Sequence, residues 1–187
     1  MPRIRQLRDD ELPPELVAML PGKEENVRTY GHQPEIYLRW LKFYDPLRAG
    51  GVVEPKTKEL ARLKVAELND CAYCLAYRST VAVADGLGEA AVCQVADYEH
   101  SDLTPREKAA IRFAEYLAVN HHAIDQAFLD DLLQHFTEAE LMELAWAIVS
   151  FLASGRLTKI FIRPSRDVSR GGGLIFAGDP APVAAVP

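Results

Sequence analysis

The sequence predicts an all-α protein: a single-domain helical bundle of about six to eight helices. Apolar residues recur at helical spacing in several segments, and no segment alternates apolar and polar residues at period two. Two segments share a helix-start signature, a threonine followed three residues later by a glutamate, at Thr104/Glu107 and Thr137/Glu140. The length of 187 residues suits one domain with a sizeable core.

The N-terminal part is predicted to contain an arm and two helices. Residues 1–23 form an extended arm with one helical turn at 15–20, because prolines and a glycine bracket that turn as helix breakers. A helix over 34–44 follows, which Pro46 should end. The next helix covers 56–68 and carries an apolar stripe at helical spacing.

A longer helix over 71–85 should follow and carry two cysteines near its start. Asp70 suits the N-cap of this helix, and Gly86 suits its end. A short helix over 88–96 completes the central part of the chain.

The C-terminal half is predicted to hold three further helices. The first begins at its N-cap Thr104, and a turn at 121–124 follows it. The second covers 125–136. The last and longest is capped by Thr137 and runs to about residue 161.

This order of segments defines an arm with a short helix (1–29), a helical domain (30–165) and a flexible tail (166–187) rich in Gly, Pro and Ala. The N-terminal residues lack the apolar core of a secretory signal, and no run approaches the about 18 apolar residues of a membrane span. Even the most apolar window, 141–152, contains Glu143. We therefore expect a cytoplasmic protein.

The composition is that of an ordinary globular protein, with 49% hydrophobic and 26% charged residues and a formal net charge of -6. A nucleic-acid-binding protein needs a clustered basic face, and a protein held at a membrane surface needs a polybasic segment. The acidic balance argues against both, so we expect neither nucleic acid nor a membrane as a partner.

The chain has three cysteines, Cys71, Cys74 and Cys93. A number that is both small and odd does not suit a structural disulfide framework. Cys71 and Cys74 share one face of the predicted helix and can form a disulfide with little backbone movement. A helix N-terminus favours a thiolate, the reactive form. The alternative interpretation is that Cys71 and Cys74 are unreactive buried residues. Metal binding is a weak one, because the pair supplies two of the about four ligands of a structural zinc. We expect no metal and no cofactor.

Two charged residues flank the cysteine pair. Arg78 lies four residues after Cys74 on the same predicted helix face, where its charge would favour a thiolate although it cannot transfer a proton. Glu59 lies near the start of the preceding helix and reaches the cysteines only if the two helices pack tightly. Otherwise Glu59 is a solvated carboxylate in a first helical turn, and Arg78 is an exposed charge or a salt-bridge partner.

The spacing Glu59, eleven residues, Cys71-x-x-Cys74 resembles the signature of the alkylhydroperoxidase D-like family, which includes carboxymuconolactone decarboxylases. The stretch KELARLKVAELNDCAYC is similar as well, as are the later segments LTPREKAAIRFAEYLAV and TEAELMELAWAIVSFLASGRL. The likeness covers residues 30–165. It implies a helical bundle of the alkylhydroperoxidase D-like type that assembles into homo-oligomers.

The resemblance also implies roles for individual residues. Cys74 is the peroxide-reactive cysteine, Cys71 is its disulfide partner, and Glu59 belongs to the proton relay. The implied substrates are small alkyl hydroperoxides, and a dithiol is the reductant. The family's histidine falls on Arg78 here, which removes the family's proton shuttle and leaves Glu59 or the neighbouring Tyr77 to handle protons.

Two alternative functions stay open. One is a carboxymuconolactone decarboxylase-like lyase, whose chemistry need not use a C-x-x-C pair. The other is a non-catalytic oligomeric redox sensor that has lost the family's histidine, which the replacement by Arg78 favours. Elsewhere, Cys93 lies in an apolar stretch and should be a core or interface residue, and His121 and His122 should lie in a surface turn.

Overall fold

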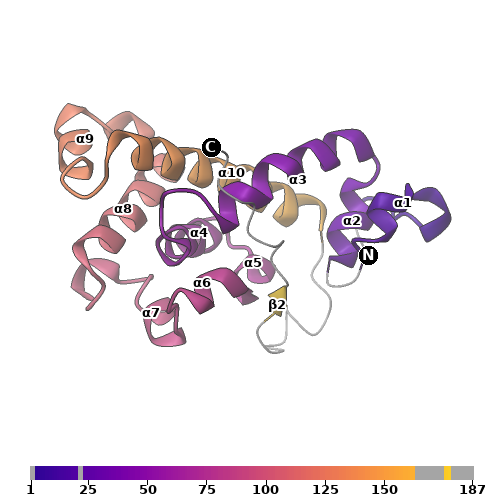
Figure 1. Cartoon of the computed structure of the whole chain (residues 1–187), viewed down its shortest axis with the longest axis horizontal. Helices are drawn as coiled ribbons and strands as arrows, with labels where there is room; N and C mark the ends of the chain where they lie inside the picture. Colours follow the sequence, from indigo (N-terminus) through magenta and orange to yellow (C-terminus); the bar gives the residue numbers. More distant parts are fainter. Residues whose placement is uncertain (1–2, 21–22, 163–174, 178–187) are drawn as a thin grey trace.

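The computed structural model describes residues 3–20, 23–162 and 175–177, and nearly all of their regular secondary structure is helical (Figure 1). The α-helices are α1 (Pro14–Val17), α2 (Glu24–Tyr30), α3 (Pro34–Ala49), α4 (Pro55–Leu68), α5 (Ala72–Ala76), α6 (Thr80–Ala84), α7 (Glu89–Cys93), α8 (Pro105–Val119), α9 (Gln126–Leu132) and α10 (Glu138–Phe161). Single 3-10 turns lie at Asp9–Glu11, Tyr98–His100 and His121–Ala123. The two strands are β1 (Tyr77–Ser79) and β2 (Ile175–Ala177).

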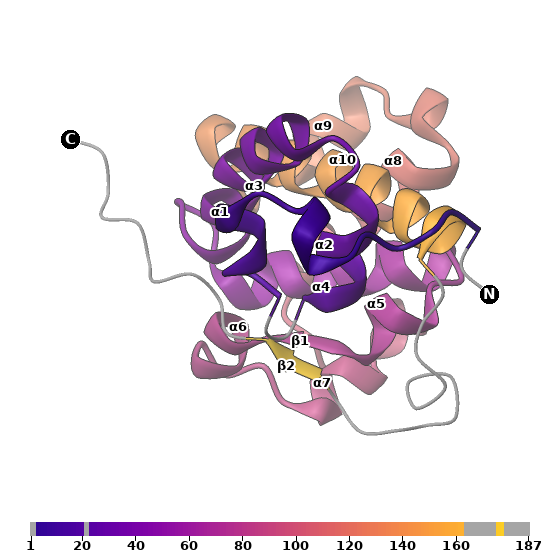
Figure 2. The same cartoon turned by 90° about the vertical axis from the view of Figure 1, so that its right-hand side faces the viewer.

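Helix α4 is the central element of the bundle. It packs chiefly against α8 and α10, and it also contacts α3, α5 and α6 (Figures 1 and 2). The largest hydrophobic cluster joins α4 to α8, α9 and α10 through residues such as Ala61, Phe113 and Ile148. The central helix is therefore held on several sides at once, which fixes the side chains that it carries.

Two further apolar clusters flank this core. One joins α4 and α8 to α6 and α7 through residues such as Leu60, Ala82 and Ile111. The other joins the N-terminal segment to α2 and α3 through Leu16 and Val27, both fully buried. Consequently α4 lies between two apolar layers, and the N-terminal helices pack as a separate layer at one end (Figure 2).

Two predictions for the N-terminal part were wrong. Helix α2 was not predicted at all, and α3 does not end at Pro46 but continues to Ala49. A proline inside a helix removes one backbone donor. The last turn of α3 nevertheless holds because Gly50 N donates to the Pro46 carbonyl at 2.9 Å, and buried Lys58 donates to the Leu47 carbonyl at 2.8 Å.

The predicted continuous helix over 71–85 was also wrong. The segment divides into α5, β1 and α6, and β1 pairs in parallel with β2, with Tyr77 opposite Ile175. The N-cap of α5 is Cys71 instead of Asp70. Asp70 has φ 48° and forms the turn after α4, in a left-handed conformation that Asp tolerates better than most residues.

Both predicted capping boxes are confirmed. Thr104 caps α8 by accepting from Glu107 N, and Thr137 caps α10 by accepting from Glu140 N, with each glutamate bonded back to the threonine N–H. The all-α fold class is confirmed too. The described residues contain ten α-helices instead of six to eight, because α2 was missed and the 71–85 segment is split.

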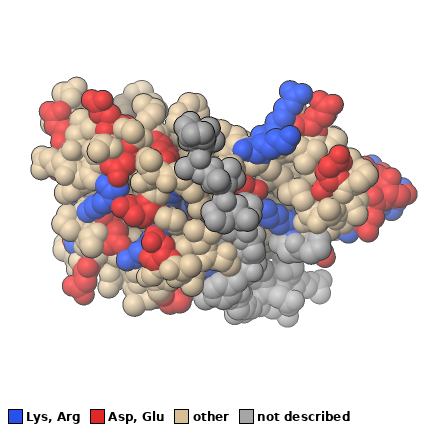
Figure 3. Space-filling view, viewed as in Figure 1, with Lys and Arg blue, Asp and Glu red and all other residues tan. Residues whose placement is uncertain are grey.

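Helix α10 is long and apolar enough to cross a membrane by length and composition, with 44% of its most apolar window buried inside the protein. The core helix of a soluble protein meets the same criteria. On the face drawn in Figure 3, acidic and basic side chains of the described residues are interspersed. The predicted domain boundaries at 29 and 165 stay predictions, and the predicted 166–187 tail lies outside the described residues except for β2.

Candidate active site

Helix α4 carries several charged side chains into the interior. All of its residues from 57 to 66 are buried. A buried ion without a partner costs several kcal/mol, so such charges are expected to be paired. The pairs in this stretch include Lys58–Glu143 and Glu59–Arg62, and Lys64 pairs with both Glu67 and Glu115. The polar interior of the molecule is thus concentrated along one helix, directly beside the cysteine segment.

Cys71 and Cys74 form a disulfide, with their Cα atoms 5.3 Å apart. Cys71 caps α5 and accepts a hydrogen bond from Cys74 N at 3.3 Å, while Cys74 lies in the first turn of the helix. Their exposures differ. Cys71 is 2% exposed, whereas Cys74 is only partly buried. An incoming reactant therefore has easier access to Cys74.

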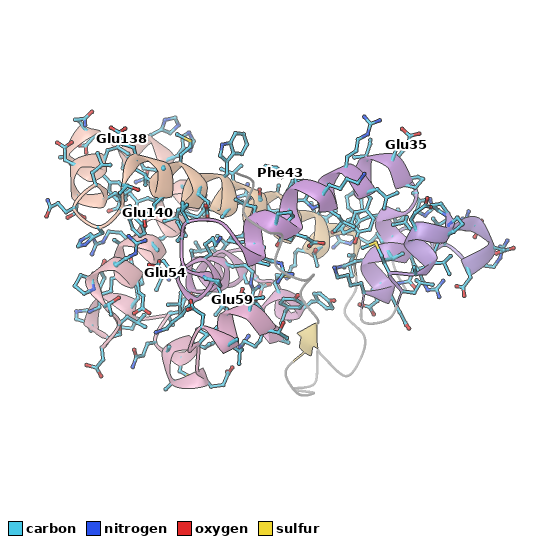
Figure 4. All side chains as sticks on the ribbon, viewed as in Figure 1. Glu35, Phe43, Glu54, Glu59, Glu138 and Glu140 are labelled. Carbon is cyan, nitrogen blue, oxygen red and sulfur yellow. A yellow bond between two sulfur atoms is a disulfide. The ribbon has the colours of Figure 1, made fainter. Side chains whose placement is uncertain are left out.

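Glu59 is buried and bound on both carboxylate oxygens. Arg62 Nε donates to Oε2 at 2.7 Å, Arg62 Nη2 donates to Oε1 at 2.8 Å, and Ser79 N donates to Oε1 at 3.1 Å. Figure 4 shows Glu59 near the centre of the molecule. The helical hairpin does bring Glu59 to the cysteine segment, but among the described residues it makes no hydrogen bond to either sulfur.

Arg62 connects Glu59 to the cysteine segment. Besides its two bonds to Glu59, its Nη1 donates to the Cys74 carbonyl at 2.8 Å and its Nη2 donates to the Tyr77 carbonyl at 3.0 Å. Burial would lower the pKa of the guanidinium, but the charge of Glu59 raises it above the ordinary value. Arg62 is thus a fixed cation that holds the backbone at the C-terminal end of α5.

Arg78 does not lie on one helix face with Cys74, because β1 interrupts the predicted helix. Its guanidinium is paired with Glu89 of α7 at 2.8 Å and also donates to the Leu75 carbonyl at 2.5 Å. The side chain is 5% exposed, so Arg78 is not an exposed charge, whereas the alternative of a salt-bridge partner is confirmed. Arg78 connects the segment that carries the two cysteines to α7, and none of its hydrogen bonds among the described residues goes to a sulfur atom.

Cys74 borders a cavity of about 130 Å3 with largely aromatic walls. Five of the seven tyrosines of the chain line it, namely Tyr30, Tyr37, Tyr44, Tyr73 and Tyr77, together with Trp40 and Phe151. Trp40 stacks on Tyr44 at a centroid distance of 5.2 Å. Tyr37, Trp40 and Tyr44 of α3 therefore lie around Cys74 in the wall of this cavity.

Three tyrosines of this cavity, Tyr30, Tyr44 and Tyr73, remain protonated at neutral pH. Burial raises the pKa of Tyr30 to about 12 and also raises the pKa values of Tyr44 and Tyr73. A neutral phenol donates a hydrogen bond and accepts one. The cavity around Cys74 can therefore hold an apolar molecule that carries an oxygen atom.

Charged and amide groups add polarity at specific points of the cavity. The guanidinium groups of Arg48 and Arg62 lie 5.7 and 5.5 Å from the ring centroid of Tyr77. Asn26 Oδ1 and Asn69 Nδ2 are buried atoms that lack a hydrogen-bond partner in the part of the chain that the structure describes. Buried polar atoms of this kind normally bind water or a ligand.

The sequence prediction missed several of these residues. Arg62 lies three residues after Glu59 on α4, a helical spacing that could have suggested the ion pair. The tyrosines come from α2, α3 and the α5–β1 segment, and no local spacing connects them. Cys93 is exposed and is therefore no core residue, whereas His121 and His122 do lie in an exposed turn.

Comparison with known proteins agrees with this architecture. The model of the carboxymuconolactone decarboxylase family matches residues 34–116, and no curated protein matches the sequence. A peroxidase-related protein from Ralstonia eutropha JMP134, described as an alkylhydroperoxidase AhpD core, is 21% identical with a TM-score of 0.75 over 89% of this chain and 94% of its own. A peroxidase-related protein from Silicibacter sp. TM1040 is 20% identical with a TM-score of 0.70 over 89% and 95% of the two chains.

A third solved structure adds a different activity. It is the debrominase Bmp8, a cysteine-to-alanine variant in complex with 2,3,4-tribromopyrrole. It is 17% identical to this chain with a TM-score of 0.72, over 92% of this chain and 97% of its own. At these identities the structural likeness establishes the fold. Residues 34–116 match the carboxymuconolactone decarboxylase family, and the chain has the fold of the alkylhydroperoxidase AhpD core.

Proposed function

We propose that this protein is a thiol-dependent peroxidase that reduces small alkyl hydroperoxides through the Cys71/Cys74 dithiol. The observation that carries the proposal is the arrangement of the pair. The two sulfurs are within bonding distance, and only Cys74 borders the aromatic cavity. Two proteins with this fold, both described as uncharacterized and peroxidase-related, are in line with it.

The proposed reaction begins at Cys74. Its thiolate attacks the terminal oxygen of the hydroperoxide, the O–O bond breaks, and the alkoxide leaves and takes a proton to become the alcohol. The sulfenic acid on Cys74 then condenses with the Cys71 thiol, which forms the disulfide and releases water. A partner dithiol reduces this disulfide by exchange and becomes oxidised itself.

The protein holds the reacting cysteine in place and supplies a proton for this reaction. Arg62 holds the Cys74 carbonyl and keeps the first turn of α5 against α4. Tyr77 lines the same cavity and can protonate the leaving alkoxide. Glu59 acts through Arg62, because its carboxylate oxygens are occupied by the guanidinium and by Ser79 N. This makes Glu59 a positioning residue, whereas the resemblance implied a member of the proton relay.

The test is to treat the fully reduced protein with one equivalent of an alkyl hydroperoxide and to map the products by mass spectrometry. We expect wild type to lose two hydrogens as a Cys71–Cys74 bridge. Cys71→Ser should retain one added oxygen on Cys74, and Cys74→Ser should consume no peroxide. The matched control is Cys93→Ser, which should behave as wild type because Cys93 is exposed on α7, outside the cavity. Three unmodified thiols in the wild type would refute the proposal.

A second candidate is reductive dehalogenation of a halogenated aromatic compound, which the aromatic walls of the cavity favour. In that reaction the dithiol would supply two electrons, the carbon–bromine bond would be replaced by a carbon–hydrogen bond, and bromide and a proton would be released. Bromide release from 2,3,4-tribromopyrrole by the reduced protein, absent in Cys74→Ser, would support it. If Cys74→Ser still turns over a lactone acid, the protein would instead be a decarboxylase-like lyase. If the dithiol is oxidised once and does not turn over, the protein would be a redox sensor.

A further inference from the structure

Asn69 brings a side-chain amide to the cavity that contains Cys74. It is the C-cap residue of α4, where its backbone N–H donates to the Val65 carbonyl at 2.9 Å. Its side chain lines the cavity together with Cys74 and with Gly155 of α10. The cavity measures about 130 Å3, so a small molecule inside it contacts several walls at once. The amide is therefore within reach of a substrate that meets Cys74.

The orientation of this amide follows from its bond to Arg156. The Nε atom of Arg156 donates to Asn69 Oδ1 at 3.4 Å. Because a guanidinium only donates, it selects the oxygen and leaves the NH2 group on the other side. Asn69 Nδ2 is buried, and no acceptor in the described part of the chain receives a hydrogen bond from it. Since buried donors are normally bonded, we expect the acceptor to be a molecule in the cavity.

Gly155 provides the space for the NH2 group. A Cβ atom added at Gly155 would lie 2.7 Å from Asn69 Nδ2, which is closer than such atoms approach each other. Glycine destabilises the interior of a helix relative to alanine, and Gly155 lies in the interior of α10. The close approach of Asn69 gives a physical reason for a glycine at this position. The amide is thus held between α10 and the guanidinium of Arg156.

Two other donors of the cavity wall are already engaged. Each nitrogen of the Arg62 guanidinium donates to Glu59 or to a backbone carbonyl. The Tyr30 hydroxyl forms a hydrogen bond of 3.0 Å with Thr158 Oγ1. The N–H groups of Asn69 Nδ2 are thus donors that the fold itself leaves available to a ligand.

The proposed reaction needs a donor at a definite place. When the Cys74 thiolate attacks the terminal oxygen, the O–O bond breaks and its electron pair stays on the oxygen that is bound to carbon. Negative charge therefore develops on this alkoxide oxygen before a proton arrives. A neutral amide N–H stabilises such a charge without losing its proton, and a donor in this role commonly accelerates a reaction by about 10²–10³.

We propose that Asn69 is a further catalytic residue, whose Nδ2–H donates to the carbon-bound oxygen of the hydroperoxide and stabilises the alkoxide as the O–O bond breaks. This inference rests on the proposed peroxidase function. The sulfur of Cys74 keeps the terminal oxygen as a sulfenic acid, and Tyr77 supplies the proton that converts the alkoxide to the alcohol. Because the amide gives up no proton, it acts in the oxidation of Cys74 and has no part in the later reduction of the disulfide.

The first test measures the two half-reactions separately. The reduced full chain is mixed with tert-butyl hydroperoxide and quenched with acid, and the Cys71–Cys74 bridge is quantified by mass spectrometry. The bridged protein is then reduced with dithiothreitol. We expect Asn69→Leu, which keeps the size of the side chain, to slow the oxidation by about 10²–10³ and to leave the reduction rate within about twofold of wild type. The matched control is Asn120→Leu, because Asn120 is the exposed C-cap of α8 and lies outside the cavity.

Gly155→Ala tests the position of the amide without removing it. The added Cβ displaces Nδ2, so the oxidation should slow by about tenfold to a hundredfold, as a small misplacement of a catalytic group does. The Tm should change little, because the higher helix propensity of alanine offsets the new contact. Gly88→Ala is the control, since a Cβ atom at Gly88 meets no atom within 4 Å, and it should be oxidised as fast as wild type.

The leaving group distinguishes stabilisation of an alkoxide from a structural role. Peracetic acid oxidises a thiolate in the same way but releases acetate, a stable anion that needs little help from a donor. The defect of Asn69→Leu should therefore be at least about tenfold smaller with peracetic acid than with tert-butyl hydroperoxide. An equal defect with both oxidants would overturn the catalytic role, because a distorted site slows both reactions alike.

Three further outcomes would also overturn the inference. If wild type is oxidised and Asn69→Leu is oxidised as fast, Asn69 is not catalytic, although the proposed function stands. If the hydroperoxide does not oxidise wild type, the proposed function fails and the inference fails with it. If Asn69→Leu lowers the Tm and slows both half-reactions equally, Asn69 is a structural residue.

Discussion

Arg62 joins the Glu59 carboxylate to the backbone of the segment that carries the two cysteines. It binds Glu59 through two nitrogens and also reaches the carbonyls of Cys74 and Tyr77. Only a planar guanidinium with five N–H donors can serve these acceptors together, so lysine is no substitute for it. Its charge in turn requires Glu59, because both groups are buried.

Glu59→Gln is therefore expected to destabilise the fold. The variant keeps the shape of the side chain but leaves the Arg62 charge uncompensated in the interior, which typically costs about 3–5 kcal/mol. Urea unfolding followed by circular dichroism measures the change. Glu35→Gln is the control, since Glu35 and its partner Arg39 are both strongly exposed, and it should unfold as wild type does. Equal stability of the two variants would contradict the buried pair.

Arg78→His is expected not to raise the peroxidase rate, although it restores the family's residue at that position. Position 78 lies in β1, and its side chain is directed to Glu89 instead of the sulfurs. The measurement is kcat/KM with an alkyl hydroperoxide and a dithiol reductant. A rise of about tenfold would mean that a side chain at 78 faces the dithiol and would favour the sensor interpretation of the natural residue.

The prediction of the site used residues that follow one another at fixed spacings. Cys71, Cys74 and Glu59 were singled out in this way, and Arg62 connects Glu59 to the Cys74 carbonyl. The prediction failed for side chains that meet through tertiary packing, such as Tyr30 and Trp40, since their separation along the chain carries no signal. The roles assigned to the three residues remain predictions.

At the scale of single elements, the capping box of α10 makes stability depend on pH. The Thr137 backbone N–H, and next the Arg106 guanidinium, hold the pKa of Glu140 at about 2, below its ordinary 4.5. A carboxylate with a lowered pKa in the folded state stabilises the fold fully above about 4.5, and this contribution is lost as the pH falls towards about 2.

The free energy of unfolding of wild type should therefore exceed that of Glu140→Gln at neutral pH, and the difference should vanish near pH 2. Urea titrations at several pH values measure it. Glu138→Gln is a matched control in the same helical turn, because Glu138 bonds neither to the cap nor to Arg106. Its difference from wild type should change much less with pH.

Local signals explain which elements were predictable. Helix α4 begins at Pro55, and helices α8 and α10 follow the N-cap residues Thr104 and Thr137. These start signals act within one helical turn, and all three helices were predicted. The prediction of one continuous helix over 71–85 failed because its causes lie in residues far away along the chain. Arg62 of α4 takes carbonyls that a continuing helix would use, and β1 pairs with a strand almost a hundred residues away.

At the scale of the whole molecule, the disulfide should contribute little to stability. It closes a loop of only four residues, which in the chain-entropy account corresponds to about 2 kcal/mol. We expect dithiothreitol to leave the far-ultraviolet circular dichroism unchanged and to lower the Tm by a few degrees. Cys71→Ser, which cannot form the bridge, serves as the control and should not respond to the reductant. Loss of helical signal on reduction would show a structural disulfide.

The global architecture was predictable because its main cause, helical periodicity in a chain of ordinary composition, is visible in the sequence. The arrangement of helices around α4 was available only through the family resemblance, since periodicity does not specify which apolar faces meet. The cytoplasmic location and the reductant stay predictions.

The stacking of Trp40 on Tyr44 in the wall of the cavity that contains Cys74 has an optical consequence. An excited indole readily transfers an electron to a nearby disulfide, whereas two thiols quench it less. The emission of Trp40 should therefore brighten when the Cys71–Cys74 bridge is reduced and dim when a substrate oxidises it again. In a Trp146→Phe background, where Trp40 is the only tryptophan, the protein would report each turnover by its own fluorescence, without an added dye.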